Sequence, residues 1–150
     1  MQQSFRPSSL VPFGFAVDRV VNDGTSMVII VHAVSRLSAC PGCGSRSERA
    51  HSRYRRGLAD LPISGRPVRL AVVVRRFHCD AVLCRRRIFT EQFDGGVVAP
   101  RARRTGRLDH VVYHLGLALC GRPPASFARR LMLPVSNDTL LRVVHRLGSL

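Results

Sequence analysis

Two runs of apolar and β-branched residues near the start of the chain predict a pair of strands. They cover residues 15–21 and 27–34 and are separated by Asn22-Asp23-Gly24. An Asp-Gly pair between apolar runs is a strong signal for a tight hairpin turn. We therefore expect an antiparallel hairpin within residues 13–34.

A second pair of strands is expected at residues 53–59 and 67–77, with the turn at Pro62-Ile-Ser-Gly65. In the later run apolar side chains occupy every second position, a period that sends alternate residues to opposite faces of a sheet. The side chains expected to face the core are Val68, Leu70, Val72 and Val74.

From residue 103 onward the apolar spacing changes to three and four, which is the spacing of one helix face. A first helix is expected at about 105–119, with a buried stripe of Leu108, Val111, Val112, Leu115 and Leu119. Gly121 and Pro123-Pro124 are expected to end it. Cys120, at this helix end, is expected to serve as a small apolar packing residue.

Two shorter helices are expected to follow. One covers residues 125–131 and ends before Leu133-Pro134. The other begins at Ser136, because a serine hydroxyl caps the first turn of a helix, and Asp138 suits the positive end of the helix dipole. Its buried side is expected to carry Leu140, Leu141, Val144 and Leu147.

The order of elements predicts an α+β chain, with a small β-rich domain followed by a three-helix helix-turn-helix domain. Two pairs of cysteines in the β-rich domain indicate that it is a zinc ribbon. The change from period two to helical spacing falls near residues 95–104. We expect a hairpin lead-in at residues 1–36, a zinc-ribbon-like domain with a four-cysteine site at 37–97 and a helix-turn-helix domain at 98–150.

The net charge of the chain indicates the class of its binding partner. The basic residues number 24, all of them Arg, against nine acidic residues, so the net charge is +15. Such a surplus repels itself unless a polyanion offsets it. The planar Arg fork suits phosphate oxygens and guanine edges. The composition therefore favours nucleic acid over an anionic membrane surface, and we expect no small-molecule substrate.

The chain carries no apolar run near the ~18–20 residues that would span a bilayer, and its first residues do not resemble a signal peptide. We therefore expect no membrane partner and a cytoplasmic location. Disulfides rarely persist in the cytoplasm. The five cysteines thus favour a metal over a disulfide.

Four of these cysteines form two close pairs, Cys40-Pro-Gly-Cys43 and Cys79-Asp-Ala-Val-Leu-Cys84. Two such pairs can complete a tetrahedral Zn²⁺ site, which leaves no open position for catalysis. Iron is the alternative ion, because four-thiolate sites accept both metals. One Cys-x-x-Cys alone is also compatible with redox chemistry, but the second pair after a hairpin disfavours it. His78 is an alternative ligand beside Cys79.

Nine arginines lie within 33 residues around the second cysteine pair and before the first helix. Their clustering predicts a track that contacts DNA phosphates without reading sequence. Besides Arg101, its members are Arg75, Arg76, Arg85, Arg86, Arg87, Arg103, Arg104 and Arg107.

Recognition of a specific DNA base sequence requires an element in the major groove. In a helix-turn-helix this element is the second helix of the motif. Here that helix begins at Ser136. Asn137 can pair with adenine, Thr139 can contact a phosphate or a thymine methyl group, and Arg142 can contact guanine or phosphate. Three-helix packing without DNA contact is the alternative.

An ordered set of residues resembles the insertion-sequence transposases of the ISL-three type. It spans roughly residues 10–148 and comprises Cys40-Pro-Gly-Cys-Gly44, Ser47, Arg49, His51-Ser52, Tyr54, Arg56, Leu58, Asp60-Leu61-Pro62, Gly65, Val68-Arg69-Leu70, Arg75-Arg76-Phe77, Cys79, Cys84, Arg86-Arg87-Ile88-Phe89, Ser136 and Asp138-Thr139-Leu140-Leu141-Arg142. One departure is Ala81, where the family pattern leads us to expect Asn.

The resemblance implies a zinc-binding domain and a helix-turn-helix that bind the terminal inverted repeats of a mobile element. It also implies a following catalytic domain with three carboxylates and two metal ions, for which this chain has no counterpart. We therefore expect no enzymatic activity from this chain alone. The resemblance also implies a bacterial, nucleoid-associated location. It implies two candidate protein partners, a second copy of the chain and a full-length transposase.

Four other functions are compatible with parts of the pattern. A stand-alone zinc-ribbon and helix-turn-helix transcription regulator would bind operators rather than element ends. A metal-dependent nuclease is disfavoured because the acidic residues are dispersed. An RNA-binding zinc ribbon is disfavoured by the helical half. A decayed gene remnant would have no function.

Overall fold

The structure, a computed structural model, describes residues 7–119 and 124–149. It confirms an α+β chain with strands first and helices last. In order, its elements are the 3-10 helix η1 Pro7–Leu10, β1 Phe15–Asn22, β2 Met27–Ala33, β3 Ser38–Ala39, β4 Arg46–Ser47, β5 Ala50–Ile63, β6 Arg66–His78, β7 Ile88–Thr90, α1 Gly106–Ala118, α2 Pro124–Arg130 and α3 Asn137–Gly148.

Both expected hairpins are present. In the β1–β2 turn the Asp23 carboxylate accepts hydrogen bonds from the amides of Thr25 and Ser26 at 2.9 and 2.6 Å. Hydrogen bonds from Ser26 and Thr25 lower the pKa of Asp23. The β5–β6 turn is shorter than expected, because Ser64 and Gly65 both adopt positive φ, 51° and 69°. Two such residues make the tight turn that matches strand twist.

The sheet joins the two hairpins through a parallel contact that was not expected. Its strand order is β1-β2-β6-β5, with β7 paired to β6. β2 runs parallel to β6, so that Ile29 lies opposite Leu70 and Val31 opposite Val72. The segment expected as a separate lead-in at residues 1–36 therefore contributes two strands to the same sheet as residues 50–78.

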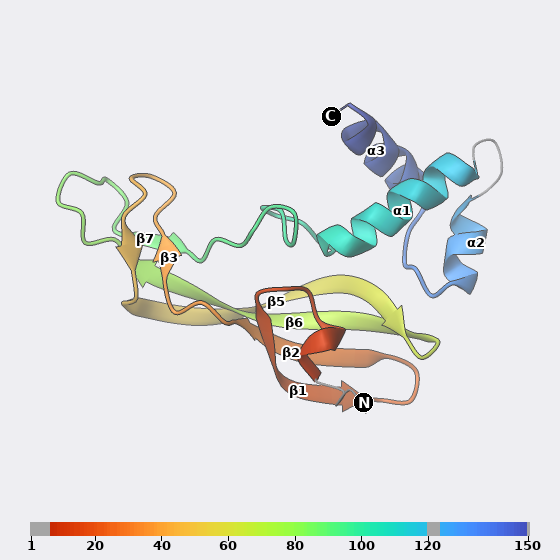
Figure 1. The fold of residues 1–150 in the computed structure, drawn as a ribbon, viewed down its shortest axis with the longest axis horizontal. Coiled ribbons are helices and arrows are strands. Elements are labelled where there is room, and N and C mark those ends of the chain that lie inside the picture. Colours follow the sequence, from red (N-terminus) through yellow and green to blue (C-terminus); the bar gives the residue numbers. More distant parts are fainter. Residues whose placement is uncertain (1–6, 120–123, 150) are drawn as a thin grey trace, which may run out of the picture.

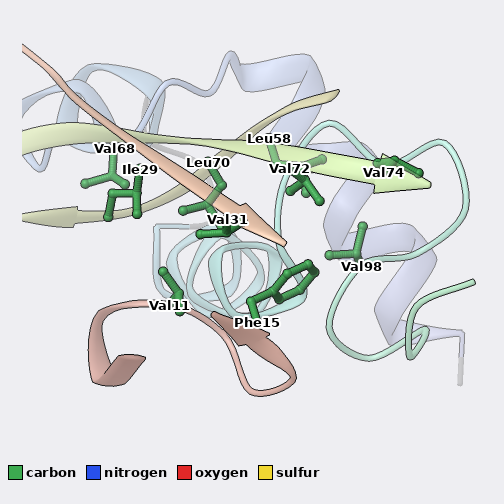
Figure 2. Close-up of a cluster of buried hydrophobic side chains, with 10 residues drawn as sticks. All are labelled: Val11, Phe15, Ile29, Val31, Leu58, Val68, Leu70, Val72, Val74 and Val98. Carbon is green, nitrogen blue, oxygen red and sulfur yellow. The ribbon is translucent and has the colours of Figure 1, made fainter. Parts of the chain in front are cut away.

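The alternation along β6 is confirmed. Val68, Leu70, Val72 and Val74 are buried, and Arg69 between them is exposed. Figure 2 shows these side chains directed toward a common core over one face of the sheet. The other buried members of this core are Val11, Phe15, Ile29, Val31, Leu58 and Val98.

The three expected helices are present, and the first and third are capped as expected. The hydroxyls of Thr105 and Ser136 accept hydrogen bonds from the amides of Leu108 and Thr139, in the first turns of α1 and α3. A Cβ built on Gly116 would lie 2.6 Å from a Val144 methyl carbon. Gly116 thus permits the close approach of α1 to α3.

Two expected core positions on the helices are wrong. Leu141 is 62% exposed and Val111 is 37% exposed, whereas Val143 is buried. The helices pack around a narrower stripe than the sequence indicates, because α1 and α3 contact each other along one line, with Leu108 and Val112 meeting Leu140 and Val143. The expectations for Cys120, Gly121 and Pro123 fall outside the described residues.

The helices are attached to the sheet through the end of β5. The Ala59 amide donates to the Arg103 carbonyl at 2.9 Å, and the Thr105 amide donates to the Ala59 carbonyl at 3.0 Å. The two loops that carry the paired cysteines are residues 40–45 and 79–87, and we call them the metal loops. In Figure 1 these loops and the helices lie over opposite ends of the sheet, and the segment after β7 connects them. Among the described helices, none has the length and apolar content needed to span a membrane.

Candidate metal centre and nucleic-acid surface

The first cysteine pair lies in a tight loop between β3 and β4, which pair with each other. The loop is closed by hydrogen bonds from the Gly44 amide to the Cys40 carbonyl and from the Cys40 amide to the Ser45 carbonyl, at 2.8 and 2.9 Å. The Gly42 amide points at the Cys40 sulfur, at 3.4 Å. Gly44 has a φ of 75°, which favours glycine.

The second pair follows β6 directly. The Cys79 amide donates to the Arg87 carbonyl at 2.9 Å, and the Cys84 amide donates to the Ala81 carbonyl at 3.0 Å. These bonds fold residues 79–87 back toward the first loop. Ala81, the departure from the family pattern, is partly buried beside the cysteines and leaves this loop intact.

The four sulfur atoms meet at one point, all within 4.8 Å of one another. Cys40 Sγ lies 3.9 Å from Cys84 Sγ, and Cys43 Sγ lies 3.6 Å from Cys79 Sγ. A tetrahedral ion with Zn–S bonds of about 2.3 Å separates its sulfurs by about 3.8 Å, whereas a disulfide requires about 2.05 Å. The four cysteines therefore fit a zinc ion, which would be structural.

The protonation of the thiols agrees with a cation site. Hydrogen bonds from Ser45 lower the pKa of Cys43 to about 6. The Ala81 amide also lowers the pKa of Cys79, but burial and the neighbouring thiols outweigh it and raise that pKa to about 12. The pKa values of Cys43 and Cys79 are thus shifted in opposite directions, and a divalent cation would stabilise both groups as thiolates.

His78 does not join this cluster of possible ligands, which consists of the four cysteines among the described residues. Its ring instead packs edge-on against His51, with centroids 5.0 Å apart. Phe77 and Phe89 stack beneath the centre, 5.8 Å apart, and share a small core with Cys40 and Cys79.

The predicted phosphate-binding arginines divide into two groups. Three of them are held by carboxylates: Arg75 pairs with Glu91, Arg104 with Asp109, and Arg107 with Asp60. Asp60 and Glu91 are almost fully buried. These three arginines connect parts of the fold, and less of their charge is available to a ligand.

The remaining arginines near the metal loops are exposed. These are Arg76, Arg85, Arg86 and Arg87. The Arg86 side chain crosses the first cysteine loop, since a Cβ built on Gly42 would lie 3.2 Å from Arg86 Cδ. The Arg76 guanidinium lies over the Tyr54 ring, 5.1 Å from its centroid.

A groove of about 840 Å³ lies between the segment before α1 and the exposed side of α3. We call it the α3 groove. It brings together two predicted residues of α3, Thr139 and Arg142, with the predicted Arg103 and Arg104. Five arginines line it in all: Arg101, Arg103, Arg104, Arg142 and Arg146.

Asn137 has a different placement from the one expected for a base-contacting residue. Its side-chain oxygen accepts a hydrogen bond from the Ala125 amide at 2.9 Å and so caps the first turn of α2. Arg146 was missed by sequence reasoning. Its position four residues after Arg142, on the same face of the helix, is the signal that could have identified it.

Comparison with protein families identifies one segment. Residues 36–84, about a third of the chain, match the family described as the zinc finger of transposase IS204/IS1001/IS1096/IS1165. The matched segment contains all four cysteines and supports an ISL3-type transposase zinc ribbon. Comparison with curated proteins finds no match, and neither does comparison with solved structures.

Proposed function

We propose that this chain, whose zinc ribbon is of the ISL3 transposase type, binds double-stranded DNA at the terminal inverted repeats of an insertion sequence. The observation that carries this proposal is the α3 groove, where five arginines line one depression beside α3. A basic groove next to an exposed helix combines phosphate contact with access to base edges.

The distribution of charge supports a polyanionic ligand. Six arginines pair with acidic side chains within the described residues. Arg101 and Arg103 in the α3 groove have no such partner among the described residues. Their charge is therefore available to phosphates.

In the proposed complex α2 and α3 act as a helix-turn-helix. Arg142 is exposed, and its ion-pair partner among the residues that the structure describes is the equally exposed Asp138, at 2.6 Å. An exposed pair of this kind exchanges partners at little cost, so that Arg142 can contact guanine or phosphate. Thr139 lines the same groove, whereas Asn137 contributes by capping α2.

We propose no catalytic role for this chain alone. Asp60, Glu91 and Asp109, the most buried of its carboxylates, are held by arginines. Cleavage and strand transfer would then require a catalytic domain on a partner, for which a full-length transposase is the candidate.

The experiment is a titration of zinc-loaded protein with duplexes at near-physiological salt. One duplex carries the terminal repeats that flank the encoding element, and the other is a scrambled sequence of equal length. We expect a preference of about a thousandfold or more, the low end for specific binding. Equal binding of both duplexes would contradict recognition of element ends.

Three variants separate the proposed roles. Arg142→Ala should relax the preference by roughly tenfold, as loss of one base contact does. Arg103→Ala should weaken both duplexes alike and reduce the salt slope by about one. Arg66→Ala, beside the β5–β6 turn and outside the groove, is the matched control and should change neither quantity.

A further inference from the structure

A second groove, of about 550 Å³, lies between the metal loops and the segment that leads to α1. We call it the Tyr54 groove. Pro41 and Arg86 line it from the metal loops, Tyr54 from β5, and Phe93 and Arg101 from the connecting segment. Arg101 also lines the α3 groove, so the two depressions meet at this residue.

Tyr54 offers an aromatic surface within this groove. Tyr54 is 38% exposed, although the strand on which it lies is paired along its length. The Arg76 guanidinium lies 5.1 Å from the ring centroid, a distance at which a cation stabilises an aromatic ring from its face. One side of the ring is thereby held, and the exposed part lies in the groove.

The charge of the groove is positive. Arg86 and Arg101 form no ion pair with a carboxylate within the part of the chain that the structure describes. Arg56, which also lines the groove, donates to the Ala102 carbonyl. The Glu91 carboxylate lies at the groove, but it is buried and paired with Arg75. The groove therefore presents uncompensated guanidinium groups around an aromatic ring.

The backbone at the junction is strained. Arg101 has a φ of 59°, in the left-handed region that costs free energy for any residue with a Cβ. This conformation places one side chain at both grooves. Strain of this kind persists where the surrounding structure holds it, and it is often found at binding sites.

We propose that the Tyr54 groove binds an unpaired nucleotide of a DNA held in the α3 groove. The base stacks on Tyr54 between Pro41 and Phe93, and the flanking phosphates contact Arg86 and Arg101. Sites for single strands combine these two features, an aromatic platform and a basic channel. The inference rests on the proposed function, because the α3 groove positions the duplex from which the nucleotide extends.

The test compares two probes bound by the full, zinc-loaded chain in a fluorescence titration. One is a blunt duplex with the terminal repeat. The other is the same duplex with a three-nucleotide DNA tail that contains 2-aminopurine. We expect the tail to raise affinity by roughly tenfold, within the range of stacking one base, and to quench 2-aminopurine.

The variants assign this gain to the groove. Tyr54→Ala should abolish both the gain and the quenching and leave affinity for the blunt duplex unchanged, whereas Tyr54→Phe should retain both. Arg86→Ala should reduce the gain without altering the strand that carries Tyr54. Arg66→Ala is again the control, and the metal content together with the melting temperature checks that each variant is folded.

An undiminished gain in Tyr54→Ala and Arg86→Ala would overturn the proposal. A tighter complex with an RNA tail than with the DNA tail would also overturn it, in favour of an RNA site. If the wild type failed to bind the blunt duplex but bound the tail in a Tyr54-dependent way, the nucleotide site would stand and the proposed function would fail.

Discussion

Asp60 shows how a single buried carboxylate connects the sheet to the helices. It lies near the end of β5 and accepts hydrogen bonds from the Thr105 hydroxyl at 2.7 Å and from Arg107 Nε at 2.8 Å. Arg107 donates in turn to the Leu10 carbonyl at 2.6 Å. One acidic group thus joins η1, β5 and the start of α1.

We expect Asp60→Ala to lower the free energy of unfolding by about 2–4 kcal/mol. The substitution leaves the Arg107 charge and the Thr105 hydroxyl without a partner, and loss of one member of a buried pair costs this much. The partial exposure of Arg107, 31%, keeps the value from being higher. Urea unfolding measures the change.

The matched control is Asp138→Ala, which removes one partner of an ion pair whose side chains are 73% and 76% exposed. Its cost should stay below about 1 kcal/mol. Equal losses in the two variants would show that Asp60 does not organise the junction.

The functions of individual arginines could be predicted only in part. Composition and clustering indicate a basic surface, but they do not separate Arg75, Arg104 and Arg107 from the rest. The partners of Arg75 and Arg107, Glu91 and Asp60, are brought to them by the tertiary fold over 16 and 47 residues. Asp109 lies only five residues after Arg104, but that spacing alone does not indicate an ion pair. The cysteines, in contrast, are recognisable because two short spacings already limit the geometry.

Among the elements, the start of α1 packs unusually tightly against the segment before it. The Gly106 amide donates to the Val97 carbonyl at 2.8 Å. A Cβ built on Gly106 would lie 1.8 Å from the Gly96 carbonyl oxygen, a backbone atom that cannot move without the segment. Glycine at this position therefore sets how α1 meets the segment.

Gly106→Ala should displace α1 or the 94–97 segment and destabilise the protein by about 1–3 kcal/mol, the usual cost of overpacking. The melting temperature measures this loss. Gly95→Ala is the control, because a Cβ there would have no neighbour within 4 Å, and its melting temperature should be close to that of the wild type. A stable Gly106→Ala would contradict the close contact.

The strands and helices themselves were largely predictable, since the period of the apolar residues and the capping serine mark them. The parallel pairing of β2 with β6 was not. Nothing in either run selects the neighbour of a strand 30 or more residues away, because both edges of β6 offer the same backbone groups. Leu141 was misplaced for a related reason, as the width of a buried stripe depends on what packs against it.

The described residues form three separate cores rather than one. The first lies over the sheet, the second among the helices, and the third around the cysteines with Phe77 and Phe89. The third core is the smallest and depends on the metal ligands themselves. Loss of the metal should therefore unfold the end of the molecule that carries the four cysteines.

We expect Cys40→Ser to lose the metal and to unfold residues 36–49 and 78–90, because ligation supplies the folding free energy of small zinc sites. Amides in α1 and α3 should keep their protection in hydrogen exchange. Cys120→Ser, at the cysteine outside the pairs, is the control and should retain one equivalent of metal.

If amides in α1 and α3 lost their hydrogen-exchange protection to the same extent as those around the cysteines, the three cores would unfold as one unit. This result would also argue against the domain boundary between residues 97 and 98, which stays a prediction from the sequence.

The position of β6 in the sheet has a consequence for synthesis of the chain on the ribosome. β2 ends at Ala33 and β6 ends at His78, and a cell takes about 2–9 s to add the intervening residues at about 5–20 residues per second. During that interval the first hairpin has no neighbour to cover Ile29 and Val31. The nascent protein therefore exposes an apolar, aggregation-prone hairpin for seconds. Its yield in a cell should depend on chaperones that bind this hairpin until β6 has been synthesised.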